Sequence, residues 1–302
     1  MKPTVFIHTN AKQIIGAIVS AHSLKRNSLQ PEQFDVRIIR REDYKFFDAY
    51  EGRAFLRGGG RRIWTNSDLQ SFTPCRFMPP ELMDYKGRAV VIDPDVFAVG
   101  DVCALLNRDM AGKAILAKPR PGYNGRPDYV ATSVMLLDCA KLTHWHVRRS
   151  FEELFAFKRD YEDWITLSYE PPGSIGHLES EWNDFDRLTE NTKLLHNTKR
   201  RSQPWKTGLR VDFTTKIPIP FVDKILGTSG IRLPLRYKQH PDRRQEQLFF
   251  ALLKECMQNG MLSEDMLRKE MAANHVRHDA LDVVSKTPPL EAVLGRSYPL
   301  PA

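Results

Sequence analysis

The chain has 302 residues, of which 41% are hydrophobic and 27% are charged. This balance excludes an intrinsically disordered chain, and the length suits one large α/β domain with an appendage, or two modest domains. No stretch approaches the ~20 apolar residues of a membrane-spanning helix, and the four cysteines form no CxxC pair that would indicate a zinc ribbon. We therefore expect a cytoplasmic protein. The formal net charge of +8 favours phosphate-bearing ligands, but it fits a basic solvated surface equally well.

The first forty residues predict the opening of an α/β sheet. Residues 4–8 read as a buried strand, and Asn10 and Gln13 have the spacing of a capping box that would start a helix. Apolar residues then recur at helical spacing and predict one face that packs on a core: Ile14, Ala17, Ile18, Ala21 and Leu24. Residues 34–39 predict a second strand, and strand, helix and strand in this order are typical of an α/β sheet.

The middle of the chain continues the same pattern. The segment 52–62 is rich in Gly and Arg and predicts a mobile basic loop without a phosphate-binding glycine motif. The apolar runs 89–92 and 134–137 predict buried strands, and each is followed by an aspartate. Residues 151–164 have helical spacing.

After about residue 215 the chain changes character. Pro218, Pro220 and Pro234 predict an irregular connector, and the apolar stripe 248–256 predicts a helix that ends at Asn259-Gly260. Ser263, followed by Glu264 and Asp265, predicts the start of another helix, because a hydroxyl cap and acids suit a helix N-terminus. We therefore expect two parts, a domain of residues 1–215 and a helical extension of residues 216–302.

The motif VIDPDVF, residues 91–97, is the sharpest chemical feature. It places Asp93 and Asp95 at the carboxyl end of a buried strand, the edge where open α/β sheets bind ligands. Two carboxylates one residue apart can hold a divalent cation that neutralises phosphates. An ordinary strand-to-turn junction, where Asp and Pro are common, is the alternative explanation.

A second polar cluster follows about a hundred residues downstream. His196 is followed by Lys199, Arg200 and Arg201, before Pro204-Trp205. An imidazole that completes an Asp–Asp site favours Mn²⁺, which accepts mixed oxygen and nitrogen ligands. The neighbouring cations are suited to a diphosphate leaving group. A histidine in a polar loop is more often simply exposed.

Over residues 3–206, the order of these motifs resembles the retaining GT-A glycosyltransferases of the glycogenin and lipopolysaccharide galactosyltransferase type (family GT8). FIHTN resembles the family's first strand, where the nucleotide base packs, and Arg76-Phe77-Met78-Pro79 resembles its R-x-x-P approach to the metal strand. VIDPDVF resembles the DxD strand, and YVATSVMLLD resembles the strand usually written FNSGVMLIN. LESEWN resembles L-P-x-x-W-N, and LLHNTKRRSQPW resembles the closing H-F-x-G-x-x-K-P-W.

The resemblance implies a GT-A (Rossmann-like nucleotide-diphospho-sugar transferase) α/β domain with a helical C-terminal extension. It implies a retaining hexosyltransferase that moves a sugar from a nucleoside diphosphate sugar, expected to be a UDP-sugar, to a hydroxyl acceptor. The acceptor would be a glycan, a lipid-linked molecule or a small molecule. Mn²⁺ (or Mg²⁺) would be held by Asp93, Asp95 and His196. The donor would also contact the following residues: Thr9, Asn10, Arg76, Lys199, Arg200, Arg201 and Lys206.

Three departures from the family pattern point to a distant branch. The family's Asn and Gly in the FNSGVMLIN strand become Ala131 and Ser133. The lysine before Pro-Trp becomes Gln203, so other cations must supply charge to the diphosphate. The family's Asp-Gln pair near the transferred sugar has a weak counterpart in Asp163-Trp164, which leaves Asp163 as the catalytic candidate.

Two other functions remain open on sequence grounds. The altered positions 131, 133 and 203 suit a catalytically silent protein that binds sugar nucleotides or glycans. The net charge and the run Arg57 to Arg62 suit a nucleic-acid-binding protein, but no recognisable binding motif accompanies them, so no nucleic-acid partner is expected.

The extension is expected to dock on the first domain and to help form the acceptor side. A purely structural brace is the alternative. The basic residues of the extension are candidates for contact with a membrane surface, a partner or a second copy of the chain: Arg232, Arg236, Lys238, Arg243 and Arg244.

Overall fold

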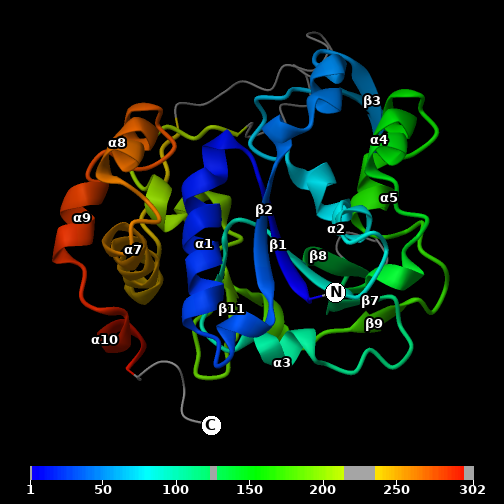
Figure 1. The fold of residues 1–302 in the computed structure, drawn as a ribbon. Coiled ribbons are helices and arrows are strands. Elements are labelled where there is room, and N and C mark those ends of the chain that lie inside the picture. Colours follow the sequence, from blue (N-terminus) through cyan, green and yellow to red (C-terminus); the bar gives the residue numbers. More distant parts are fainter. Residues whose placement is uncertain (1, 123–127, 214–234, 296–302) are drawn as a thin grey trace.

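The computed structural model describes residues 2–122, 128–213 and 235–295, and it is built around a six-stranded mixed sheet (Figure 1). The strand order is β2-β1-β5-β8-β7-β9. The strands are β1 (Thr4–Thr9), β2 (Asp35–Arg40), β5 (Arg88–Ile92), β7 (Ile115–Arg120), β8 (Tyr129–Asp138) and β9 (Ile175–His177). The α/β fold class expected from the sequence is confirmed.

In the parallel part of the sheet, neighbouring strands end at the same edge, which brings together the polar residues that follow them. β1 pairs in parallel with both β2 and β5, and Ile7 lies opposite Ile92. All six residues of β1 are buried, as are four of the five in β5, because both faces of this part are covered by other elements. The residues that follow Ile7 and Ile92 therefore emerge at the same carboxyl edge.

Helix α1 (Ile14–Arg26) follows β1 directly, as the sequence predicts, but the predicted capping box is wrong. A 3₁₀ turn (Ala11–Gln13) precedes the helix, and Asn10 makes no side-chain cap hydrogen bond. Its amide instead donates to the carbonyls of Asp68 and Leu69, both at 3.2 Å. A tertiary contact with a distant loop has replaced the local one.

The predicted apolar face of α1 is only part of its buried surface. Ala17 and Leu24 pack among the residues of the sheet, while Ile15 and Val19 join a second core that the extension completes. Figure 1 shows α1 between the sheet and α7. The helix is therefore covered on two sides, which a single hydrophobic stripe does not predict.

The segment predicted to be a mobile basic loop is a β-hairpin. Strands β3 (Ala54–Arg57) and β4 (Gly60–Ile63) pair antiparallel. The turn residues Gly58 and Gly59 have φ angles of 59° and 73°, which suit a two-residue hairpin turn. Their N–H groups donate to the carboxylate of Asp160 at 2.8 Å each, so the hairpin tip is fixed by a residue about a hundred positions away.

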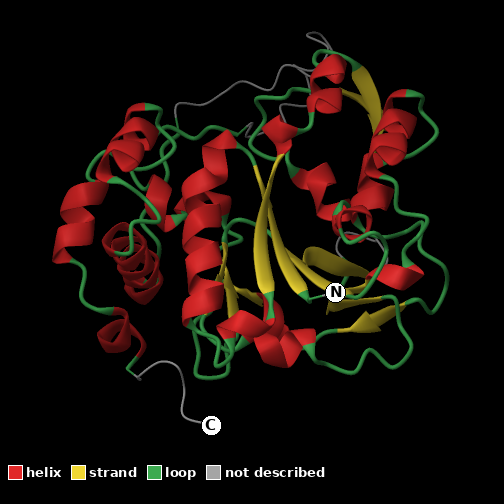
Figure 2. Cartoon of the chain, in the orientation of Figure 1, coloured by secondary structure: helices red, strands yellow, loops and turns green. Residues whose placement is uncertain are grey.

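The helical segment predicted at 151–164 is two helices. Helix α4 (Val147–Phe155) ends before a left-handed residue, Phe157 (φ 57°), and α5 (Tyr161–Ile165) begins after Asp160, whose side chain accepts from the Glu162 N–H. Short helices α2 (Pro79–Leu82) and α3 (Val102–Leu106) complete this part (Figure 2).

A small second sheet carries the downstream polar cluster. Its order is β10-β11-β6, with β10 (Asp184–Phe185), β11 (Leu194–His196) and β6 (Val96–Ala98). β11 and β6 are antiparallel, and His196 lies opposite Val96. This pairing joins the segment after Asp95 to the segment that contains His196.

From Arg243 onward, the described part of the extension is made mainly of helices. It consists of α7 (Arg243–Gln258), α8 (Glu264–Ala272), α9 (Ala280–Lys286) and α10 (Leu290–Leu294). Ser263 caps α8 by accepting from the Met266 N–H, and α7 ends at Gln258, directly before the predicted stop signal Asn259-Gly260. No helix among the described residues is both long and apolar enough to cross a membrane. The proposed boundary at 215/216, the three connector prolines and Arg232 lie outside the described residues.

Docking of the extension is mediated by α7. Leu248, Phe249 and Leu252 share one core with Ile15 and Val19 of α1. Trp205, from the segment after His196, stacks on Phe249 with ring centroids 4.7 Å apart. The extension therefore packs directly on the segments that carry the polar cluster.

Candidate metal site at the carboxyl edge of the sheet

Three potential metal ligands converge where β5 ends. One ligand atom from each of Asp93, Asp95 and His196 lies within 4.8 Å of the others, and we call these residues the trio. The Asp93 N–H donates to the carbonyl of Ser133 in β8 at 3.0 Å, which extends the ladder beyond Ile92. The Asn197 N–H donates to the carbonyl of Asp95 at 3.0 Å, which holds the two segments of the trio together.

Gly16 allows α1 to lie against this turn. A Cβ atom at this position would be 2.6 Å from the carbonyl oxygen of Pro94, closer than any normal contact. The helix can therefore approach the Asp93–Asp95 turn only because residue 16 has no side chain.

Asp93 is surrounded by cationic and imidazole groups. Arg76 donates from Nη2 to Asp93 Oδ1 at 2.6 Å, and His8 Nε2 lies 2.9 Å from the same oxygen. Burial by itself would raise the pKa of Asp93, but Arg76 and His8 hold it well below its usual range. Burial lowers the pKa of His8, so this ring is neutral near pH 7. Asp93 therefore stays anionic and available as a ligand.

Arg76 is itself held in place by β8 and α5. Its Nη1 donates to Thr132 Oγ1 at 2.6 Å, and Thr132 donates to the carbonyl of Ile165 at 2.8 Å. The structure thus places Arg76, predicted to contact the nucleotide sugar, beside Asp93, a candidate metal ligand.

Asp95 and His196 face each other. His196 Nε2 lies 3.3 Å from Asp95 Oδ1, and Gln203 donates to the other carboxylate oxygen at 3.0 Å. Burial would lower the pKa of His196, but the carboxylates of Asp95 and Asp93 raise it above its ordinary value. A metal ion that binds Nε2 takes the place of a proton there, so metal binding is coupled to proton release.

Asn183 orients the imidazole of His196. Its Oδ1 lies 2.9 Å from His196 Nδ1, and its amide nitrogen donates to Ser133 Oγ at 2.9 Å. With a carbonyl oxygen as partner, Nδ1 carries the ring proton and Nε2 is left to face Asp95. Such an outer contact fixes the tautomer and orientation of a metal-binding histidine.

The residues present fit a hard or borderline divalent cation. Two carboxylates and one imidazole nitrogen form a mixed oxygen and nitrogen donor set, which suits Mn²⁺ and accepts Mg²⁺ less readily. Each member is supported by a named neighbour: Arg76 for Asp93, Gln203 for Asp95 and Asn183 for His196.

The other predicted site residues are distributed around the trio. Thr9 and Asn10 are buried at the carboxyl end of β1. Lys199, Arg200 and Arg201 are exposed and follow His196 closely. The Lys199 N–H donates to Asp186 Oδ1 at 3.2 Å, so this exposed run is anchored by its backbone.

Lys206 and Asp163 lie apart from the exposed cations. Lys206 is fully buried, and its ammonium group is 2.6 Å from the carboxylate of Asp212. That pairing gives Lys206 a structural partner, so the geometry lends no support to a donor contact. Asp163 is exposed on α5, and the described link from α5 to the trio runs through the carbonyl of Ile165 instead.

Sequence reasoning missed four residues that support the trio: His8, Gly16, Thr132 and Asn183. His8 had a signal, since a polar side chain near the end of a buried strand is unusual. In the sequence, Gln203 stands out only because it replaces the lysine of the family motif. Its contact with Asp95 depends on tertiary structure.

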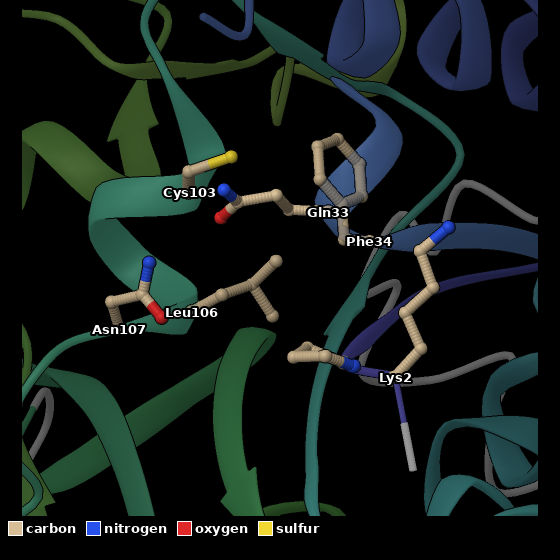
Figure 3. Close-up of a pocket in the computed structure, with 7 residues that line it drawn as sticks. Lys2, Gln33, Phe34, Cys103, Leu106 and Asn107 are labelled. Atoms are coloured by element: carbon tan, nitrogen blue, oxygen red, sulfur yellow. The ribbon is translucent and has the colours of Figure 1, made fainter. Parts of the chain in front are cut away.

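A cavity of about 440 Å³ lies at the opposite, amino-terminal edge of the sheet (Figure 3). It is lined by Lys2, Pro3, Gln33, Phe34, Cys103, Leu106 and Asn107. Burial raises the pKa of the Cys103 thiol to about 11, so it is not a nucleophile near neutral pH. This cavity does not belong to the trio.

The chain is similar to three glycosyltransferases of known structure. The apo glycosyltransferase GlyE of Streptococcus pneumoniae TIGR4 is 15% identical, with a TM-score of 0.47 over 68% of this chain and 56% of that one. The galactosyltransferase LgtC, in complex with donor and acceptor sugar analogs, is 16% identical, with a TM-score of 0.45 over 67% of this chain and 89% of that one. Mouse xyloside xylosyltransferase 1 is 15% identical, with a TM-score of 0.40 over 65% of this chain and 97% of that one.

This chain thus spans just over half the length of GlyE. No protein-family model and no curated protein sequence matches it. At this level of similarity, the activity has to be argued from the trio and its surroundings.

Proposed function

We propose that the protein is a metal-dependent glycosyltransferase that moves a sugar from a nucleoside diphosphate sugar to a hydroxyl acceptor. The observation that carries the proposal is the Asp93, Asp95 and His196 trio at the carboxyl edge of the sheet. Ligands of open α/β sheets bind at this edge. The expected donor is a UDP-sugar, and the expected cation is Mn²⁺, with Mg²⁺ as the weaker substitute.

When bound, the cation would supply positive charge to the diphosphate and so stabilise its departure. The remaining groups of the chain shape the site around this charge. Arg76 and His8 keep Asp93 anionic, and Asn183 holds Nε2 of His196 toward the ligand position. Lys199, Arg200 and Arg201 are exposed, follow His196 closely in the chain and would add charge for the leaving diphosphate.

Retention of configuration is the expected stereochemical outcome, as the resemblance to the GT8 family implies. Asp163 is the only carboxylate proposed for a direct catalytic role, and it lies on α5 with an exposed side chain. A front-side attack, in which the leaving phosphate assists the acceptor hydroxyl, needs no protein nucleophile and suits this geometry better. Residues 1–215 would carry the donor site, and the extension would help to form the acceptor side.

Calorimetric titration tests the metal and donor parts together. UDP should bind the wild type tightly with Mn²⁺, more weakly with Mg²⁺, and not measurably with a chelator. His196→Ala should reduce Mn²⁺-supported binding more than Mg²⁺-supported binding, because the nitrogen ligand favours the softer ion. His144→Ala removes an exposed histidine that is paired with Glu170, and it should match the wild type.

Turnover separates an enzyme from a silent binding protein. Wild-type protein incubated with Mn²⁺ and a panel of UDP-sugars should release UDP, by transfer or by slow hydrolysis. Metal-independent binding of UDP by the wild type would contradict the proposal. Tight metal-dependent binding without any sugar release would leave a sugar-nucleotide-binding scaffold.

A further inference from the structure

A larger cavity, of about 880 Å³, opens between the first domain and the extension. One wall is the segment 207–212, which follows Trp205, and another is the turn 273–279 between α8 and α9. Arg236 and Lys12 complete the lining. None of the residues of the trio lines this cavity, so it is separate from the proposed metal site.

The turn 273–279 is fixed to the first domain. The Arg277 N–H donates to the carbonyl of Trp205 at 2.7 Å, and its guanidinium group contacts Glu246 of α7 at 3.2 Å. Trp205 in turn stacks on Phe249. The two walls therefore keep a defined separation, as a binding site requires.

The lining has more positive than negative charge. Its cations are Lys12, Arg210, Arg236 and Arg277, and its acids are Asp212 and Asp279. Both acids already accept hydrogen bonds from neighbouring side chains. Asp212 is 2.6 Å from the Lys206 ammonium and accepts from Tyr237, and Asp279 accepts from Arg277 at 2.7 Å.

Three of the cations form no direct ion pair among the described residues, although Lys12 is close enough to lower the pKa of Asp212. Within the parts of the chain that the structure describes, no carboxylate lies at ion-pair distance from Lys12, Arg210 or Arg236. Lys12 donates to the carbonyl of Ser67 at 2.6 Å, and Arg236 donates to the carbonyl of Gly208 at 2.6 Å. These contacts orient the side chains without neutralising them.

Arg210 and Arg236 also face each other across a β-bridge. They are directly opposed in an isolated antiparallel pair, and both are exposed. Side chains opposed in this way share one face, and like charges there destabilise the pair. An anion bound between the two guanidinium groups removes this repulsion, and a guanidinium can bind a phosphate through two parallel hydrogen bonds.

We propose that this cavity binds the phosphate of a phosphate-bearing acceptor, with Arg210, Arg236 and Lys12 as its contacts. Lys12 lies in the turn just beyond the carboxyl end of β1, the edge that also carries the trio, which suits a ligand that extends from this cavity toward the donor. The role as acceptor depends on the proposed function, whereas the phosphate site stands on its own residues. A phosphorylated sugar and the headgroup of a phospholipid-linked glycan share this chemistry.

The test is a calorimetric titration of glucose 6-phosphate, with glucose as the uncharged control. Wild type should bind the phosphorylated sugar and not glucose. Arg210→Gln/Arg236→Gln should lose about tenfold or more in affinity, since two charge-assisted contacts are removed. Lys238→Gln/Arg243→Gln removes two exposed cations outside the cavity and serves as the control for net charge. Melting temperatures establish that each variant is folded, and Lys12→Gln gives an independent charge removal that leaves the Arg210–Arg236 bridge intact.

Two further arms separate this site from the metal site. Binding of glucose 6-phosphate should persist in Asp95→Ala, and Mn²⁺-dependent UDP binding should persist in Arg210→Gln/Arg236→Gln. If the double variant loses UDP as strongly as glucose 6-phosphate, the cavity belongs to the donor site and the proposal is wrong. Equal loss in the control variant would reduce the effect to net charge and also overturn it. If the wild type binds glucose 6-phosphate but no UDP, the proposed function fails while the phosphate site stands.

A cosedimentation experiment distinguishes a lipid headgroup from a phosphorylated sugar. It uses vesicles of neutral phosphatidylcholine with and without an anionic phospholipid. Cosedimentation that depends on the anionic lipid and on Arg210 and Arg236 assigns the site to a lipid headgroup. Binding of glucose 6-phosphate without cosedimentation assigns it to a phosphorylated sugar.

Discussion

The carboxyl edge of the sheet and the interface between α1 and α7 use buried side chains in opposite ways. At the edge, the half-buried Asp93 and Asp95 are held close together with His196, and Arg76 and His8 lower the pKa of Asp93 and so favour its charged form. At the interface, Leu252 and its neighbours in α7 pack against Ile15 and Val19. Close carboxylates destabilise a fold unless a cation or a donor compensates, whereas buried apolar area stabilises it. The comparison suggests that ligand binding and stability reside in separate regions.

The largest effect is expected at the metal site. Asp95→Ala should lower turnover by more than about 10³-fold, because it removes a ligand of the cation that stabilises the leaving group. The melting temperature should change little, because the loss of the Gln203 and His196 contacts is offset by the removal of a carboxylate that lies close to Asp93. A sugar-release assay and a thermal melt of the same preparation measure both quantities. Full activity in this variant would remove the trio from the mechanism.

The counterpart at the interface should affect only stability. Leu252 is fully buried, and Leu252→Ala should cost about 2–5 kcal/mol of the free energy of unfolding through lost burial and the cavity left behind. Urea unfolding measures this loss. Affinity of the folded protein for Mn²⁺ and UDP should be unchanged at low temperature. A comparable loss of affinity would show that the two regions are coupled.

Variants of Asn183 test how much the residue that orients His196 contributes to metal binding when His196 itself is kept. Asn183→Ala should weaken Mn²⁺ binding about 10–100-fold, as expected when the outer partner of a metal-binding histidine is lost. Asn183→Asp restores an acceptor for Nδ1 and should recover part of the affinity. Metal titration by calorimetry distinguishes the two variants. Equal weakening in both would indicate a packing role only.

Gly16 lies between the two regions, on α1 and against Pro94. In most helices, Gly→Ala stabilises by about 1 kcal/mol. Here the added Cβ would meet the Pro94 carbonyl at 2.6 Å, so Gly16→Ala should destabilise by about 1–3 kcal/mol through overpacking. It should also weaken Mn²⁺ binding, because the displaced turn carries Asp93 and Asp95. A gain in stability would contradict the close approach. Ala21→Gly, at a half-buried position of the same helix, is the control for helix propensity.

The smallest effect concerns the polar edge of the α1–α7 interface. Glu255 of α7 contacts His22 at 2.7 Å and Arg26 at 2.8 Å. Burial would raise the pKa of Glu255, but these partners lower it below its ordinary value. Because its pKa is lower in the folded state, the contact stabilises above the unfolded pKa, and this contribution is lost as the pH falls through the folded pKa.

Glu255→Gln should therefore cost about 1 kcal/mol at pH 7, a modest value because the site is partly solvated. The difference from wild type should shrink as the pH falls below the ordinary glutamate range. Unfolding curves at several pH values measure this trend. Glu152→Gln, in a solvent-exposed pair with Arg148 inside α4, should show almost no difference at any pH. A pH-independent difference at Glu255 would assign the effect to packing.

The sequence by itself determined the local elements and the candidate ligands. Periodicity predicted the β1–α1–β2 opening and the strand before Asp93, and Ser263 as a capping residue predicted the start of α8, because these features depend on neighbouring residues. The DxD spacing and the histidine followed by cations pointed to Asp93, Asp95 and His196.

Tertiary structure decided the rest, because the contacts join residues far apart in the chain. The Asn10 side chain donates to the loop around residue 70 instead of capping a helix. The Gly-rich segment forms a hairpin whose tip is held by Asp160. The support of Asp93 by His8 and Arg76 depends on which strands are neighbours in the sheet. Arg210 and Arg236 likewise come to lie opposite each other only once the two segments pair. Local free energies can be inferred from a single stretch of sequence, whereas charge interactions across the fold need the distances that folding creates.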